Sequence, residues 1–258
     1  MKKKALVMVM AAAMAAAMTA CGGSKSATAD TTAAAADTAA AETAAESKAD
    51  ETTAAADTSD KTWVIATDTA FKPFEYTDDS GNFVGIDMEI LKAIAEDQGF
   101  KYDVQVLGWD ASIAACQAGQ ADGMIAGASI TDERKNSGWI FSDGYYDANQ
   151  SMAVAENSDI TGFDDLKGKK VAVKTASMSA DYAESIKDQY GFEITYFEDS
   201  PTMYQAVVGG QVAACFDDTP IMASNIKDTG IAMKLVDGTG NDPAEYGLSL
   251  IHISEPTR

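Results

Sequence analysis

The chain has 258 residues, with 40 acidic and 19 basic side chains and a formal net charge of −21 at neutral pH. This excess of negative charge argues against nucleic-acid binding and against adhesion to anionic lipid. Residues 61–247 are numerous enough for one large domain or two small lobes, and they contain no apolar run long enough to span a membrane.

The first 20 residues have the pattern of a secretory signal peptide. Three lysines at 2–4 precede an apolar run from Ala5 to Ala17, which is too short and too rich in alanine for a good membrane span. Residues 18–21 then resemble a bacterial lipobox, in which cleavage before Cys21 leaves that cysteine to carry lipid. We therefore expect a bacterial protein lipid-anchored at the outer face of the cell membrane, or located in the periplasm. An ordinary secretory signal with an incidental Cys21 is the alternative.

Residues 21–60 are expected to form a disordered tether. From Gly22 to Asp60 the sequence is dominated by Ala, Thr, Asp, Ser and Glu, and it has no aromatic residue and no Val, Ile or Leu. Such a segment cannot bury enough apolar surface to fold, and its carboxylates keep it extended.

The last eleven residues, 248–258, resemble the translation of a sequencing-library adapter. We therefore expect the natural chain to break off near Gly247, so that the folded part is C-terminally truncated and 248–258 is not native; a genuine terminus is the alternative. His252 is the only histidine of the chain and falls in this segment, so it is left out of the candidate site.

Strand and helix patterns alternate from residue 61 onward. Apolar residues recur at helical spacing from Ile86 to Ile94, ahead of Gly99, and Trp109 is assigned to a loop. This alternation predicts an α/β layer. The expected elements are a strand at 63–67, a loop at 68–74, a helix from 86 up to 99, a strand at 102–107, a helix at 111–118 and a strand that runs into 126.

The same order then repeats. The second half has expected strands at 170–174 and 193–197, a helix around 182–186, another at 203–208 and a strand into 216–220. Segments 116–125 and 207–216 both read as a helix end, a Gly-Gln pair and a strand. This internal similarity predicts two similar lobes with ligand-binding residues at the carboxyl ends of their strands.

The segment Ala126–Lys135 places a cation where the helix dipole disfavours one. Residues 131–133 supply a capping hydroxyl and two carboxylates for the first helical turn, and Arg134 follows them with the opposite charge. The small residues Gly127 and Ser129 let a ligand approach the backbone closely. The segment is therefore a candidate carboxylate clamp; an ordinary exposed arginine is the alternative.

Polar and aromatic residues follow the expected strand ends in both halves. Together they supply a cationic fork, carboxylates and flat apolar surfaces, the groups that bind a free α-amino acid. With no Cys/His constellation and no nucleophile–base pair, we expect no metal site, no cofactor and no catalytic residue. The set comprises Asp68, Phe71, Phe74, Trp109, Gly127, Ser129 and Arg134, followed by Lys174, Thr175, Ser177, Asp217 and Asp218.

These motifs resemble the family 3 extracellular solute-binding proteins, the polar amino-acid receptors of ABC importers, and glutamine-binding proteins are the most similar in appearance. The resemblance covers nearly all of residues 61–247 in order. It implies a two-lobed periplasmic-binding-protein-like α/β fold of type II, in which each lobe is a mixed sheet flanked by helices and the ligand is enclosed between the lobes. The stretches that carry it are 66–75, 85–87, 130–134, 141–146, 166–173 and 218–220.

The resemblance assigns the α-groups of the ligand to four positions. Arg134 would hold the α-carboxylate together with the Ser129 N–H. Asp218 would hold the ammonium, together with the backbone carbonyl of Gly127.

The resemblance also assigns the ligand side chain. Phe71 and Trp109 would sandwich the ligand, and Asp68 and Lys174 would reach its side chain. Ser177 completes the expected ligand-binding residues.

The chain departs from the family pattern at two places. It has Asp217-Asp218 where glutamine receptors often have His-Asp, and Ala176–Met178 where they have a Gly-Thr-Gly type of loop. An extra carboxylate would favour a basic ligand and Met178 would narrow the pocket, so the ligand stays open between a glutamine-like amino acid, our first choice, and a basic one. Possible specificity residues are Asp217, Met178, Thr175 and Phe74. Two further positions, Glu75 and Glu89, are explained equally well as solvated rim and helix-face residues.

The family also implies the course of the chain. Lobe 1 is expected at 61–150 and lobe 2 at 151–243, with the first crossing at 150–155 and 244–247 as the start of a return to lobe 1. Truncation after that point would leave lobe 1 without a closing helix. The implied partners are a free polar amino acid, an ABC permease and its ATPase, and the membrane through lipid on Cys21, and the protein is expected to be a monomer.

Two other functions are open. A dehydratase of the same fold could use Asp217 and Asp218 as acid and base, and a sensor could couple the same lobes to a signalling chain. Cys116 and Cys215 lie among apolar residues and are expected to be separate buried thiols, although a disulfide is possible in this compartment.

Overall fold

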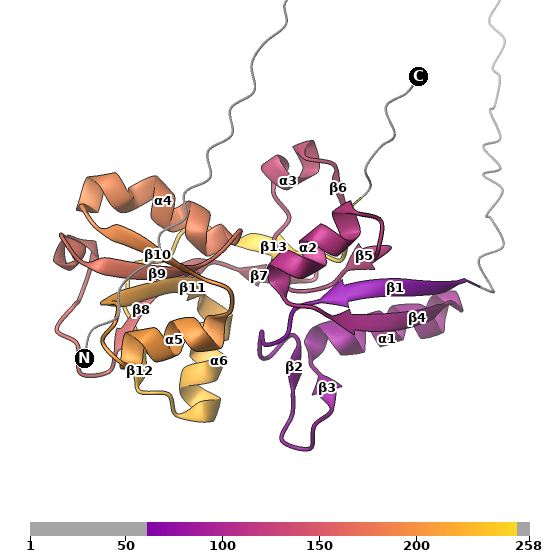
Figure 1. The fold of residues 1–258 in the computed structure, drawn as a ribbon, viewed down its shortest axis with the longest axis horizontal. Coiled ribbons are helices and arrows are strands. Elements are labelled where there is room, and N and C mark those ends of the chain that lie inside the picture. The colour runs from indigo at the N-terminus through magenta and orange to yellow at the C-terminus, as the bar shows by residue number, and fades with distance from the viewer. Residues whose placement is uncertain (1–60, 252–258) are drawn as a thin grey trace, which may run out of the picture. The chain divides into compact units, whose positions relative to one another are not determined.

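The computed structural model describes residues 61–251 (Figure 1). The expected signal peptide at 1–20, the lipidated Cys21, the tether at 21–60 and the residues after 251 lie outside the described part. Within the described part, no helix combines the length and the apolar character that crossing a membrane requires.

The first five-stranded sheet has a helix on each face. Strand β1 pairs in parallel with β4 and β5, whereas β14 runs antiparallel to β5 and β6. Successive residues of β1 face opposite sides, so Ile65 packs with Leu91 of α1 and Ala66 packs with Cys116 of α2. The order is β4 (Lys101–Val106), β1 (Thr62–Thr67), β5 (Gly123–Met124), β14 (Ser249–Ile251), β6 (Trp139–Phe141), and the helices are α1 (Ile86–Gln98) and α2 (Trp109–Gln117).

The second sheet is built in the same way. Strand β9 pairs in parallel with β10 and β11, and β8 runs antiparallel to β11 and β12. Val171 packs with Ala183 of α4, whereas Ala172 packs with Met203 of α5 and Met222 of α6, so helices cover both faces (Figure 1). The order is β10 (Glu193–Phe197), β9 (Lys170–Lys174), β11 (Ala214–Asp218), β8 (Gln150–Ala155), β12 (Met233–Leu235), and the helices are α4 (Met178–Tyr190), α5 (Ser200–Val208) and α6 (Thr219–Thr229).

The predicted internal repeat is confirmed by these two sheets. Each has three parallel strands, then one strand that runs antiparallel to them, then a fifth that runs parallel to the first three again, in the same spatial order. The two Gly-Gln pairs form the same turn: Gln120 N donates to the Ala115 carbonyl at 2.8 Å, and Gln211 N donates to the Ala206 carbonyl at 2.9 Å. The first lobe is the one built on the first sheet, and the second lobe is the one built on the second.

Smaller elements complete the fold. Strand β13 pairs with β7 antiparallel, and β2 pairs with β3 in a hairpin. Strand β14 belongs to the segment that we expect to be non-native; its pairing does not test its origin, which stays a prediction. These elements are β2 (Tyr76–Thr77), β3 (Phe83–Val84), α3 (Asp132–Asn136), β7 (Tyr146–Ala148), the 3-10 helix η1 (Phe163–Leu166) and β13 (Ala244–Tyr246).

Two expectations about the elements were wrong, and some elements were not expected. Trp109 is the first residue of α2 rather than a loop residue, because Gly108, with φ of 94°, ends the loop before it. Gln150–Ala155 is not a crossing but a strand inside the second sheet, with five of its six residues buried. Helix α6 and strand β12 were not expected; the Pro220 in the first turn of α6 fits the preference of proline for that position.

The two cysteines of the described part are free and buried, as expected. Cys116 lies in α2 and Cys215 in β11, so they belong to different lobes. Burial, assisted by Asp122, raises the pKa of the Cys116 thiol to about 11, which keeps it protonated and unreactive.

Two glycines of the β2–β3 hairpin region should respond very differently to alanine. A Cβ at Gly85 would lie 2.0 Å from the Phe74 carbonyl oxygen at a φ of 140°, whereas Gly81, at a φ of 84°, has nothing within 4 Å of a Cβ. Gly85→Ala should therefore destabilise by about 3 kcal/mol or more, and Gly81→Ala by about 1 kcal/mol. Urea unfolding measures both, and equal losses would contradict the described packing.

Candidate functional site

Loops at the carboxyl ends of strands from both sheets line one pocket. Three predicted site residues, Asp68, Phe74 and Thr175, do not line this pocket, but Asp68 contacts the lining residue Lys174. The cavity volume is about 20 Å³, room for about one water molecule, so an amino acid can enter only when side chains or lobes move apart. The lining residues are Phe71, Trp109, Ala126, Gly127, Ser129, Arg134, Lys174, Ser177, Met178, Asp217 and Asp218.

Arg134 is placed by a capped turn and two indole rings. The predicted cap is confirmed, because the Thr131 hydroxyl accepts from Arg134 N at 3.1 Å. The guanidinium donates to the Ser129 carbonyl at 2.8 Å and lies 5.2 Å and 5.3 Å from the ring centres of Trp109 and Trp139. Burial lowers the pKa of Arg134, opposed by Asp218 and others. A guanidinium has five N–H groups, so donors remain for a carboxylate.

Asp218, at the end of β11, accepts hydrogen bonds from two other segments. Gln150 Nε2, at the start of β8, donates at 2.6 Å, and the Tyr246 hydroxyl, from β13, donates to the other oxygen. Burial and then Asp217 raise the pKa of Asp218 to about 6. A carboxylate offers about four lone-pair sites, so two remain for a ligand ammonium.

Asp217 is occupied by structural contacts. Its carboxylate accepts from the Tyr204 hydroxyl at 2.7 Å and from Asp218 N at 2.9 Å, and it is fully buried among them. Our reasoning that an extra carboxylate favours a basic ligand is weaker at Asp217, because its oxygens already accept from these donors, and burial raises its pKa despite the opposing effects of the donors and of Lys174.

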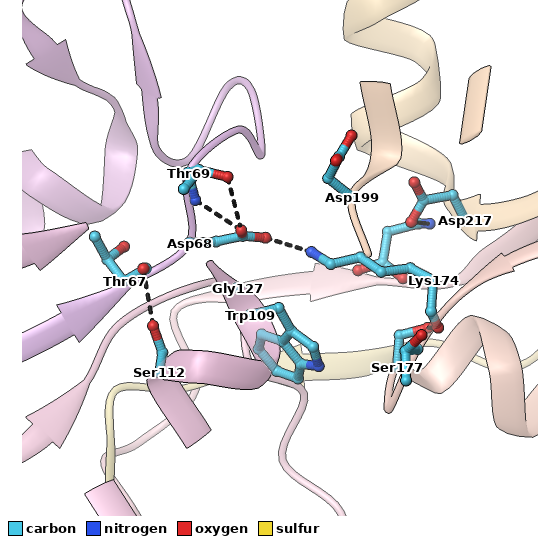
Figure 2. Close-up of polar contacts among 12 residues, drawn as sticks. Thr67, Asp68, Thr69, Trp109, Ser112, Gly127, Lys174, Ser177, Asp199 and Asp217 are labelled. Carbon is cyan, nitrogen blue, oxygen red and sulfur yellow. Dashed lines mark hydrogen bonds and ion pairs between the residues drawn. The ribbon is translucent and has the colours of Figure 1, made fainter. Parts of the chain in front are cut away.

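A buried ion pair joins the two lobes. Lys174 ends β9, Asp68 follows the equivalent strand β1, and the ammonium donates directly to the carboxylate (Figure 2). The ammonium also lies 4.9 Å from the ring centre of Phe71 and 5.5 Å from that of Trp109. Burial by itself lowers the pKa of Lys174, but Asp68 and Asp217 outweigh it and raise that pKa above its ordinary value. The Lys174 ammonium therefore lies against both of the aromatic rings that we assigned to the ligand.

Gly127 has to be glycine. Its φ is 55°, and a Cβ there would lie 2.6 Å from the ring of Phe71. Its N–H donates to Asp87 Oδ2 at 2.9 Å, so the peptide that lines the pocket is fixed from behind.

The loop at 175–178 contacts the first lobe through its backbone. The Trp109 indole N–H donates to the carbonyl of Ala176 at 3.0 Å, and Ala176 has a left-handed φ of 52°. The Ser177 hydroxyl caps α4 by accepting from Ala180 N at 3.2 Å and donates to the Lys174 carbonyl. Thr175 donates away from the pocket, to the carbonyl of Phe197.

Sequence reasoning missed the aromatic residue Tyr246. Its ring packs against Phe74 at 5.0 Å and Phe71 at 6.4 Å between ring centres, and its backbone forms a bridge with Ser129. Gln150, the other donor to Asp218, was also missed. The one signal for Tyr246 was the resemblance of 244–247 to a returning segment, which said nothing about its hydroxyl.

The two glutamates outside the candidate set have opposite environments. Glu89 is exposed on α1, as a helix-face residue should be. The expectation that Glu75 is solvated at the rim was wrong, since its side chain is fully buried with no hydrogen-bond donor in the described part.

Comparison with known proteins decides the family. Residues 63–207, more than half of the chain, match the bacterial extracellular solute-binding proteins, family 3. The chain belongs to this family.

Solved structures of similar proteins agree with the two-lobed fold. The arginine-, lysine-, histidine-binding protein ArtJ of Geobacillus stearothermophilus is 31% identical with a TM-score of 0.68, over 76% of this chain and 84% of that one. An ancestral arginine-binding protein, solved with arginine and with glutamine, is 32% identical with a TM-score of 0.67 in both cases. The arginine-bound structure is matched over 74% of this chain and 84% of that one, and the glutamine-bound structure over 73% and 83%.

Curated relatives match over shorter stretches. The arginine-binding extracellular protein ArtP of Bacillus subtilis is 35% identical over 133 residues, which are 52% of this chain and 51% of that protein. The chain spans between 51% and 64% of the length of three such relatives.

For a zwitterionic ligand in this pocket, we predict that the affinity falls as the pH drops below about 6. The raised pKa of Asp218 means that the carboxyl is protonated below about pH 6, and only its ionised form attracts an ammonium. Calorimetric titration with glutamine should show the dissociation constant rising toward tenfold per pH unit below that value. Tyr246→Phe removes a hydrogen bond that lowers the pKa of Asp218 and should move this loss to higher pH. A flat profile from pH 7.5 to pH 5 would contradict the role of Asp218.

Proposed function

We propose that this chain is the binding protein of an ABC importer, which captures a free polar amino acid between its lobes and delivers it to a permease and its ATPase. The observation that carries this proposal is that Arg134 of the first lobe and Asp218 of the second line the same pocket. A zwitterion presents one carboxylate and one ammonium, so both residues would be satisfied by one ligand. The protein is a receptor in this proposal, and it converts nothing.

Backbone groups supplement the two charges. The Gly127 and Ser129 peptides line the pocket beside Arg134, and no side chain of Gly127 separates the ligand from them. The α-carboxylate would take the guanidinium N–H groups that the Ser129 carbonyl leaves free. The ammonium would take the remaining lone pairs of Asp218.

The Lys174–Asp68 pair supports a ligand with a neutral polar side chain, glutamine-like first and basic second. A basic side chain between Phe71 and Trp109 would meet the Lys174 ammonium, a like charge in a buried site. A carboxamide can accept from the ammonium and donate to Asp68 without disrupting the pair. Similar proteins named for arginine, lysine or histidine keep the basic alternative open.

We propose that the chain acts as a monomer on the outer face of the bacterial membrane, held by lipid on Cys21 and the tether at 21–60. The family assignment to extracellular solute-binding proteins supports an extracellular site of action. Membrane extraction of metabolically lipid-labelled protein, with Cys21→Ala as control, tests the anchor.

The specificity test compares glutamine with arginine on a Lys174→Gln variant. Wild type should bind glutamine at least tenfold more tightly than arginine. Lys174→Gln leaves Asp68 buried without its cation, so the affinity for glutamine should fall. Arginine brings a guanidinium to Asp68, so the ratio of arginine affinity to glutamine affinity should rise at least tenfold. Calorimetry of both ligands on both proteins gives the four dissociation constants.

Lys170→Gln is the matched control. It makes the same chemical change at the exposed start of the same strand, and it should leave both affinities unchanged. A wild type that prefers arginine would refute the neutral ligand, and a wild type that binds neither ligand nor any polar amino acid would refute the proposed function. Turnover of a candidate substrate would favour an enzyme.

A further inference from the structure

Glu75 is a buried acid that the proposed binding mechanism does not use. It follows the pocket residue Phe71 in the same loop, where Phe71 N donates to the Glu75 carbonyl at 2.7 Å. Its side chain is fully buried, and neither carboxyl oxygen has a hydrogen-bond donor within the described residues. An ionised carboxylate in such a place is strongly disfavoured.

Asp87 lies beside Glu75 and is also buried. It is the second residue of α1, and each of its oxygens accepts a hydrogen bond: Gly127 N donates to Oδ2 at 2.9 Å and the Tyr145 hydroxyl donates to Oδ1 at 2.9 Å. Asp87 therefore holds the Gly127 peptide, which lines the pocket on its other side.

Two adjacent buried carboxyl groups cannot both be ionised at low cost. A proton on Glu75 lets it donate to Asp87, which gives Glu75 a partner and adds a third donor to Asp87. The surrounding charges act in the same direction. Burial, then Asp87 and then Asp68 raise the pKa of Glu75 well above its ordinary value of 4.5, and Lys174 only partly offsets them.

The pKa of Asp87 is raised by burial, but its donors Gly127, Tyr145 and Glu75 each oppose that rise. The proton thus belongs on Glu75 and the charge on Asp87. The charged and titratable groups around Glu75 are Asp87 on α1, Asp68 after β1, Lys174 on β9 and Tyr145 before β7.

We propose that Glu75 is a positioning residue that stays protonated and, by donating to Asp87, fixes the Gly127 peptide against which the amino acid binds. The proposal rests on the proposed function, since Gly127 matters to binding only if the pocket takes an amino acid. Its first half, the retained proton, can be tested without any ligand.

The proton is tested by the pH dependence of unfolding. An unfolded glutamate loses its proton near its ordinary pKa of 4.5, whereas folded Glu75 keeps it to a much higher pH. Folding then retains one proton in this interval, so the free energy of unfolding falls as the pH rises. Glu75→Gln cannot titrate at this position. Between pH 5.5 and 7, the free energy of unfolding of wild type should therefore fall with pH more steeply than that of Glu75→Gln, by the equivalent of about one proton.

Glu89→Gln is the matched control, because it makes the same change at an exposed position on the helix that carries Asp87. It should keep the wild-type slope. Equal slopes for wild type and Glu75→Gln would overturn the retained proton.

The positioning role is tested by binding of glutamine at pH 7. The amide of Glu75→Gln can donate to Asp87 in place of the protonated acid, so affinity should stay within about threefold of wild type. Glu75→Leu fills similar space without a donor, and affinity should fall at least tenfold. If Glu75→Leu binds glutamine like wild type, or Glu75→Gln binds as weakly as Glu75→Leu, Glu75 does not act through Asp87.

The two failures are distinguishable. If wild type binds no polar amino acid, the proposed function fails, while the unfolding slopes still decide the state of Glu75. Should Glu75→Leu not fold, Glu75→Gln and the slope comparison still decide the retained proton.

Discussion

The buried ion pair between Lys174 and Asp68 is the interaction around which the rest of the site is arranged. Neither charge is tolerable in this location alone, because removing one partner of a buried pair costs about 3–5 kcal/mol. The two residues end equivalent strands of the two sheets, so their contact brings the lobes together at the pocket. The pair also places the Lys174 ammonium against the rings of Phe71 and Trp109. A ligand side chain that enters there would have to be compatible with this positive charge and with the Asp68 carboxylate.

Duplication of one sheet topology explains why opposite charges from the two lobes line the same pocket. In the first lobe the loop after β5 carries Gly127, Ser129 and the turn that places Arg134. In the second lobe the equivalent strand β11 ends at Asp218. Asp218 is further connected to the neighbouring strand β8 of the same sheet through Gln150, and to β13 outside that sheet through Tyr246. A ligand ammonium would therefore bind a carboxylate whose position depends on chain segments outside its own strand, which couples binding to lobe arrangement.

Periodicity and local chemistry predicted much of this fold. Strands β9 and β10 have the predicted bounds, and the Gly-Gln repeat predicted two equivalent turns. Arg134 was found from its sign at a helix start, and the structure places it at the pocket with the predicted Thr131 cap. These features depend on residues that are close together in the sequence, which is why the sequence alone could predict them.

What could not be predicted depends on partners far apart in sequence. Glu75 reads as a solvated loop residue until Asp87 and Gly127 are packed around it. Asp217 reads as a free carboxylate until the Tyr204 hydroxyl reaches it. Tyr246 has no local pattern that would direct its hydroxyl to Asp218. In each case the missing information was the donor or neighbour brought in by the tertiary fold.

The central claim is that Arg134 holds the α-carboxylate of an amino acid, and a cycle of two changes tests it directly. Calorimetry would measure glutamine and its analogue with the α-carboxylate reduced to an alcohol, each on wild type and on Arg134→Ala. If Arg134 binds that carboxylate, Arg134→Ala should weaken glutamine binding by about 2–5 kcal/mol and leave the analogue's affinity nearly unchanged. Equal losses for both ligands, or no loss for glutamine, would contradict the account.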